Sequence, residues 1–471
     1  MRHGSDRGPL IYVAGRGATL LLAPLSVVVL PALLGEAGYG RYGYWFGLIS
    51  VYMILFDLGT QPMLRRFLPE LAPRRQSRGL FMRALWLKLI PLALMLAAVP
   101  FQDQPAVTVT LLSAGLLAAL ATNLSDVAYA YQRMGWQVVA VIGRRVLRLL
   151  LVPLLFLGFG VPGILAALVL AELLAVLLAL PAMRLLREDH VELGAPFLDY
   201  YAQGLWVFGA ALIAVLLGRL PVFAAQWSDV APEAVGRIAL AVDLTYFALK
   251  ELLSGVSESL LPRLVTHQAA GQDQRWRELV GLNYRLINLA GLGILTLGLG
   301  LGGAFLGLLG HGFYRAEPAF ALLLPAVLFG GWNLIHNQLL LLHRRSDQIL
   351  QNQAAGLLTA LTLIALVWPV LPIETLALAS TAGVTVACGL SYLQSRRSVP
   401  DAGALAGFLR LLPVAALVGG ALTAWAPRGL RQTALAAALG GLVYLGGALA
   451  VRALRAEDLT LLRRAAFGEA R

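Results

Sequence analysis

The chain has 471 residues, of which 59% are hydrophobic and only 13% are charged, with 37 Lys and Arg against 25 Asp and Glu. A soluble protein needs roughly a quarter of its residues charged to cover its surface. The composition therefore excludes a soluble enzyme and a disordered or collagen-like chain. The composition also excludes a disulfide-stapled fold, because Cys388 is the only cysteine.

Apolar blocks of about 20 residues or more follow one another, and each is long enough to cross a hydrocarbon layer about 30 Å thick as a helix. The sequence predicts an all-α, polytopic membrane protein with about 14 transmembrane helices. We place them at 9–33, 41–64, 80–100, 107–131, 137–157, 162–183, 202–226, 236–262, 279–308, 319–342, 350–370, 374–394, 404–425 and 432–453.

Arginines are concentrated in alternate connections. The segment after the second predicted helix carries Arg65, Arg66, Arg74, Arg75 and Arg78, whereas the opposite connections carry few cations. Cytoplasmic loops of membrane proteins collect Lys and Arg, so we expect both termini to be cytoplasmic. The same rule explains the formal net charge of +12 without a nucleic-acid partner.

Two segments resemble each other across the chain. Gly35-Glu-Ala-Gly-Tyr-Gly-Arg-Tyr42 matches Pro232-Glu-Ala-Val-Gly-Arg-Ile238, and each opens an even-numbered helix that ends in a Leu-Pro pair. The offset predicts two six-helix lobes related by a parallel repeat, at 1–200 and 201–400. Two additional C-terminal helices and a cytoplasmic tail follow at 401–471. Such repeats are a recurrent transporter plan, with the substrate site between the halves.

Signs of catalysis are missing from the sequence. No connection between predicted helices exceeds about 20 residues, so none could carry a catalytic domain. There is no P-loop motif, and the six histidines have no metal-ligand spacing. We therefore expect no catalytic residue, no metal site and no cofactor.

Three stretches resemble the second-helix region of Wzx-type polysaccharide flippases: Gly35 to Gly43, Phe56-Asp-Leu-Gly59 and Arg65-Arg-Phe-Leu-Pro-Glu70. Gly310-His-Gly-Phe-Tyr-Arg-Ala-Glu-Pro resembles their turn between helices nine and ten. These proteins belong to the multidrug/oligosaccharidyl-lipid/polysaccharide (MOP) exporter superfamily.

The resemblance implies a two-lobed bundle in the bacterial cytoplasmic (inner) membrane. It implies alternating access on an undecaprenyl-diphosphate-linked oligosaccharide. Membrane lipid, a polysaccharide polymerase and glycosyltransferases are then the other candidate partners.

Ionisable residues at membrane depth are costly and are candidates for function. In the first lobe, Arg16, Asp57, Lys88, Asp126, Arg144, Arg145, Arg148 and Glu172 lie roughly 5 to 11 residues in from the predicted cytoplasmic ends. Cations outnumber anions there. Arg144 and Arg148 share a helix face, which favours an anionic diphosphate headgroup as ligand.

Each of these assignments has an alternative. The cations near the helix ends could instead extend their charges to the interface. Asp57, Asp126 and Glu172 are either ion-coupling sites or partners in buried pairs, and Asp57 lies at a depth that matches Arg16.

The second lobe has fewer candidates. Arg219 and Asp243 lie at matching depth on adjacent helices, so we expect an ion pair or a coupling site. Lys250 and Arg285 are candidate substrate contacts. Asn333 and Asn337 share a face and could bind sugar hydroxyls or pack between helices.

The sequence thus favours a flippase for a lipid-linked oligosaccharide, with Arg16, Arg144 and Arg148 among its headgroup contacts. One alternative is a drug/cation antiporter like the MATE proteins, which would need an anionic or aromatic cavity. The other is a scaffold or enzyme subunit of envelope polysaccharide synthesis.

Overall fold

The computed structural model describes residues 8–453 apart from 72–74, 132, 188–195, 229, 311, 344, 368–371, 397–403 and most of 255–270. All of the regular elements within these residues are helices. The chain divides into two compact units. Unit 1 comprises residues 1–226 and 231–236, and unit 2 comprises 227–230 and 237–471. The predicted divisions at 200 and 400 remain predictions.

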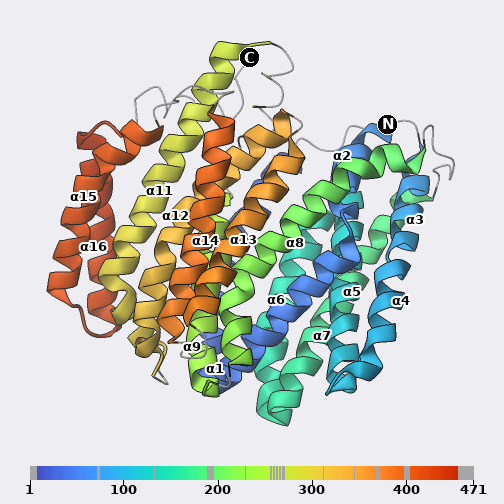
Figure 1. Ribbon diagram of the computed structural model, residues 1–471, viewed down its shortest axis with the longest axis horizontal. Coiled ribbons are helices and arrows are strands. Elements are labelled where there is room, and N and C mark those ends of the chain that lie inside the picture. Colours follow the sequence, from blue (N-terminus) through green and yellow to red (C-terminus); the bar gives the residue numbers. More distant parts are fainter. Residues whose placement is uncertain are drawn as a thin grey trace. The chain divides into compact units, whose positions relative to one another are not determined.

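Unit 1 is a bundle in which α1 packs against α5 and α6, while α7 packs against α5 and α6 (Figure 1). Its elements are α1 (Gly8–Asp57), α2 (Thr60–Leu71), α3 (Ser77–Leu87), α4 (Leu89–Ala98), η2 (Val99–Phe101), α5 (Pro105–Ala130), α6 (Met134–Phe159), α7 (Val161–Ala179), η3 (Leu180–Leu186) and α8 (Phe197–Trp227), whose last residue belongs to unit 2.

Unit 2 is built around α12, which packs against α11 and α14, and the last two helices lie against α11 (Figure 1). The chain enters it through α9 (Pro232–Val242), whose residues up to Gly236 belong to unit 1. Its other elements are η4 (Asp243–Leu249), α11 (Asp273–Leu308), η5 (Phe313–Ala316), α12 (Glu317–Leu342), α13 (Ser346–Val367), α14 (Ile373–Ser395), α15 (Ala404–Trp425) and α16 (Gly429–Ala450).

The described residues contain ten helices that are long and apolar enough to cross a membrane. An eleventh span is formed if the bent pair Leu25–Asp57 and Thr60–Leu71, whose axes differ by 50°, is counted as one. Three predicted spans fall outside this count. Block 9–33 is the first part of α1, block 137–157 is α6 with its three arginines, and block 236–262 runs into residues that are only partly described.

Two breaks divide the long α1–α2 segment. Gly35 has φ 68° and ψ 175°, which interrupts the helix between the predicted spans 9–33 and 41–64. A second break follows Asp57, where Leu58 has φ 48° and Gly59 has φ 81°. The second predicted span is therefore two helices. Positive φ is easy for glycine and strained for leucine, so Gly59 is suited to this turn.

The repeated motifs meet at two glycines. A Cβ on Gly40 would lie 2.8 Å from the backbone nitrogen of Gly236, and a Cβ on Gly236 would overlap the carbonyl group of Glu36. Side chains at either position would separate the two backbones. Small residues of this kind allow membrane helices to approach closely, and this explains why both motifs contain a glycine here.

Replacing Gly236 with alanine should therefore lower the thermal stability of the purified protein, because overpacking at a tight contact costs about 1–3 kcal/mol. Gly441 in α16 is the matched control, since a Cβ there would meet nothing within 4 Å. Gly441→Ala should be neutral or slightly stabilising. Equal unfolding temperatures for the two variants would contradict the close approach at Gly236.

Candidate functional site

An ion cluster between α6 and α7 brings together three of the predicted residues. The Nε of Arg144 lies 2.7 Å from one carboxylate oxygen of Glu172 and donates a 2.9 Å hydrogen bond to the other. Arg148 donates through its Nη2 to the same carboxylate. Arg144 and Arg148 lie one helical turn apart, so both reach Glu172 from one face of α6.

The cluster is asymmetric in its burial. The side chain of Glu172 is 1% exposed, whereas those of Arg144 and Arg148 are 20% and 15% exposed. The carboxylate therefore lies behind the two guanidinium groups and holds them in place. Two positive charges face one negative charge, so these three side chains carry a net positive charge.

Neighbouring side chains hold the guanidinium groups further. The guanidinium carbon of Arg148 lies 4.6 Å from the ring centroid of Phe46 in α1, which is a cation–π contact. Arg144 Nη2 lies 3.7 Å from the sulfur of Met53. The Nε of Arg148 is buried and has no hydrogen-bond acceptor among the described residues. Arg148 therefore retains an unused donor.

A second polar cluster surrounds the break between α1 and α2. Asp57 accepts hydrogen bonds from Thr60 Oγ1 at 2.8 Å and from the backbone nitrogen of Gln61 at 2.9 Å. It thus caps the first turn of α2. Lys88, which separates α3 from α4, lies 3.9 Å from Asp57 and donates to the Phe56 carbonyl and to Thr60 Oγ1.

The break also exposes the Leu58 carbonyl, which accepts a 2.7 Å hydrogen bond from the hydroxyl of Tyr201 in α8. The Cβ that Gly59 lacks would collide with the Gly204 carbonyl of the same helix. The Asp-Leu-Gly element therefore caps α2, makes the turn and seats it on α8. These contacts give Asp57 a structural role at the break.

Asp126 in α5 is fully buried and lies 2.8 Å from the Nε of Arg65 in α2. The sequence placed Arg65 in a cytoplasmic connection and did not predict this contact. Two of the three candidate carboxylates of unit 1, Asp126 and Glu172, thus have arginine partners, and the third, Asp57, lies beside Lys88.

In unit 2, Lys250 follows the π-helical turn η4. Its Nζ lies 5.8 Å from the ring centroid of Tyr246, whose hydroxyl is 2.9 Å from Ser380 Oγ. A Cβ on Gly330 of α12 would touch the side-chain stem of Lys250. Single π turns inside helices often mark functional positions.

The two candidate asparagines of α12 differ. Asn337 Oδ1 accepts a 3.4 Å hydrogen bond from Ser391 of α14, so this side chain contributes to helix packing. Asn333 is 8% exposed, and its Oδ1 has no hydrogen-bond donor among the described residues. Between them along the chain, His336 Nδ1 lies 2.9 Å from the Tyr284 hydroxyl and 3.0 Å from Ser395 Oγ.

Several candidates stay predictions. The side chain of Arg16 lies outside the described part of α1, so its pairing with Asp57 is untested. Arg219 and Asp243 are both buried but belong to different units. Arg219 also lies over the ring of Phe46, with its guanidinium carbon 5.1 Å from the centroid. Arg285 is half-buried in α11.

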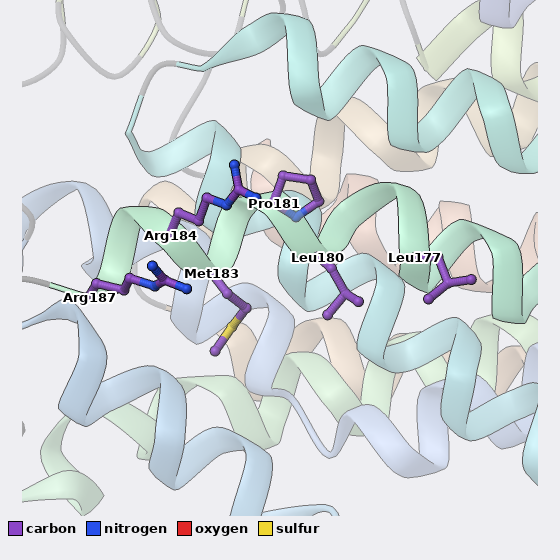
Figure 2. Close-up of a pocket in the computed structure, with 6 residues that line it drawn as sticks. All are labelled: Leu177, Leu180, Pro181, Met183, Arg184 and Arg187. Carbon is purple, nitrogen blue, oxygen red and sulfur yellow. The ribbon is translucent and has the colours of Figure 1, made fainter.

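A cavity of about 260 Å³ lies along α7 and η3. It is lined by Leu177, Leu180, Pro181, Met183, Arg184 and Arg187. Figure 2 shows the two leucines and Met183 on the same side of the helix. No predicted site residue lines this cavity, so it is distinct from the Glu172 cluster. Within the described residues, no group of three His, Cys, Asp or Glu side chains could hold a metal ion.

The fold is similar to that of solved transporter and flippase structures. The lipid II flippase MurJ in an inward closed conformation is similar over 96% of this chain and 100% of its own, at a TM-score of 0.71 and 10% identity. A point mutant of the MATE transporter VcmN from Vibrio cholerae is similar over 84% of this chain and 96% of its own, at a TM-score of 0.58 and 17% identity.

An inward-facing multidrug resistance MATE transporter of the MOP superfamily covers 84% of this chain and 98% of its own, at a TM-score of 0.60 and 12% identity. No curated protein sequence matches the chain. The ten helices that are long and apolar enough to cross a membrane, together with these similarities, define a multi-pass membrane protein with the fold of MOP-superfamily transporters. Residues 6–268 match the model of the family described as "Polysaccharide biosynthesis protein", and the chain belongs to that family.

Glu172→Gln tests the ion cluster in this protein. Removing one member of a buried ion pair strands the other charges, which costs roughly 3–5 kcal/mol. We expect a clear fall in unfolding temperature in detergent. Asp103→Asn is the control, because Asp103 is exposed in the turn before α5. Unfolding of Glu172→Gln at the temperature of the Asp103→Asn variant would refute the role of Glu172 in holding the arginines.

Proposed function

We propose that this protein translocates an undecaprenyl-diphosphate-linked oligosaccharide across the cytoplasmic membrane by alternating access. The observation that carries the proposal is the pair of arginines of α6 held on Glu172, which lies in the candidate span Val161–Leu186. It rests also on membership of the polysaccharide biosynthesis family.

The arginine pair suits a diphosphate for three reasons. Guanidinium groups offer planar, paired donors that match phosphate oxygens. The buried Glu172 engages one side of each arginine and leaves both partly exposed. The three side chains keep a net positive charge, which favours an anionic headgroup over a cationic drug.

The antiporter alternative receives less support. A cation-binding cavity needs a carboxylate that is free to bind the substrate or the coupling ion. Of the three candidate carboxylates in unit 1, Glu172 and Asp126 contact arginines. Asp57 caps α2 and lies beside Lys88. All three are committed to other groups in this conformation.

The proposal also includes the orientation of the chain in the membrane and the enzymes that act before and after it. Glycosyltransferases would build the substrate on the cytoplasmic side, where both termini of the chain would also lie. A polymerase would use the product on the other side. The chain itself would catalyse no bond change, and its substrate's polyprenyl tail would stay in lipid.

The direct test is flipping of a lipid-linked oligosaccharide in proteoliposomes. Changing both Arg144 and Arg148 to Ala would strand the buried Glu172, so we combine Arg144→Gln, Arg148→Gln and Glu172→Gln. This triple variant should fold, because no charge is left unpaired. Its flipping rate should fall at least about tenfold, since each lost charge-assisted hydrogen bond is worth about 1.5–3 kcal/mol.

Arg187→Ala is the matched control, because Arg187 is an exposed arginine of the same unit. It should flip substrate at the parental rate. A triple variant that flips substrate as fast as this control would reject the headgroup role of the arginines.

A further inference from the structure

Lys88 lies near the middle of the 25-residue candidate span Ser77–Phe101 and is 2% exposed. A lysine at this depth is costly unless its ammonium group is held by partners. It cannot reach the interface from the centre of a span as residues near helix ends do. Its presence therefore needs an explanation in its surroundings.

The ammonium group sits among oxygens supplied by the α1–α2 break. Nζ lies 3.1 Å from the Phe56 carbonyl, 3.1 Å from Thr60 Oγ1 and 3.9 Å from Asp57 Oδ1. A carbonyl at the end of a half-helix, a hydroxyl and a carboxylate are the groups that bind a hard cation. Broken helices of transporters use such carbonyls to coordinate sodium ions.

Hydrogen bonds around Thr60 connect the ammonium group to the rest of the cluster. The hydroxyl donates to Asp57 and accepts from both Lys88 and Asn123 Nδ2, at 3.1 Å each. Asn123 is fully buried, and its Oδ1 has no hydrogen-bond donor among the described residues. The Thr60 hydroxyl thus links the ammonium group to Asp57 and to Asn123.

Among the residues that the structure describes, the ion pairs of the neighbouring carboxylates supply no second cation to Asp57. Asp126 is engaged by Arg65, and Asp57 receives only neutral donors from α2. Without Lys88, the Phe56 carbonyl would lose this hydrogen bond and Asp57 would lose the cation that lies 3.9 Å away.

We propose that the Lys88 ammonium is a built-in cation, which occupies a position that would otherwise bind a monovalent metal ion at the α1–α2 break. The break in unit 1 then needs no external cation. Truncating Lys88 should create an empty cation site lined by Phe56, Asp57 and Thr60. The inference bears on how this unit is held during the proposed transport, but its test needs no substrate.

The experiment follows thermal unfolding of the purified full-length protein in sodium, methylammonium or choline chloride at equal ionic strength. The parent should unfold at one temperature in all three salts. Lys88→Ala should unfold lower in choline, which is too large for the site. It should regain at least about 2 °C in sodium or methylammonium, as expected for a ligand that binds only the folded state.

Three further variants make the test specific. Arg83→Ala removes an exposed cation from the same span and should behave as the parent does. Lys88→Met fills the site without charge, so it should be destabilised and gain nothing from small cations. Adding Asp57→Asn to Lys88→Ala should abolish the response to sodium while keeping a side chain that can cap α2.

The proposal is overturned if Lys88→Ala or Lys88→Met is as stable as the parent in choline. It is also overturned if sodium and methylammonium stabilise the parent and Lys88→Ala equally, or stabilise neither. If Lys88→Ala cannot be purified, the same comparison is made with Lys88→Ser, which also leaves the site open. None of these readouts depends on flipping, so failure here is distinguishable from failure of the proposed function.

Discussion

Every peptide carbonyl at membrane depth needs a hydrogen-bond donor, because lipid supplies none. The break between α1 and α2 frees such carbonyls. Side chains from the α3–α4 junction and from α8 supply the missing donors. Lys88 donates to Phe56 and Tyr201 donates to Leu58. These bonds tie α1, the α3–α4 junction and α8 to one point. The bend of 50° between α1 and α2 is thereby fixed in place.

The same constraint governs the charges. Glu172 and Asp126 are almost inaccessible to solvent, and each contacts at least one arginine that is more exposed than the carboxylate. Because each carboxylate is more buried than its arginine partners, it holds the guanidinium groups on the more exposed side of the cluster. At Arg144 and Arg148 two cations share one anion, and this uneven ratio distinguishes the cluster from an ordinary structural pair.

Much of the fold could be predicted, because apolar blocks long enough to span a membrane leave few alternatives to helices. The shared face of Arg144 and Arg148 followed from helical spacing alone. The prediction of one helix over 41–64 is wrong at the break after Asp57, where Gly59 and Pro62 interrupt the apolar pattern. The contacts of Lys88 with Thr60 and of Arg65 with Asp126 join residues 28 and 61 positions apart. Sequence periodicity carries no information about which helices become neighbours at such separations.

The central claim is that two arginines held on a buried glutamate form the binding site for a diphosphate headgroup. It is tested most directly by titrating the purified protein with a short-chain prenyl diphosphate and measuring heat or fluorescence at several salt concentrations. The account predicts binding that weakens as salt rises and that is lost when Arg144 and Arg148 become Gln together with Glu172. The account would be contradicted if that variant bound as tightly as the parent, or if the affinity of the parent did not depend on salt concentration.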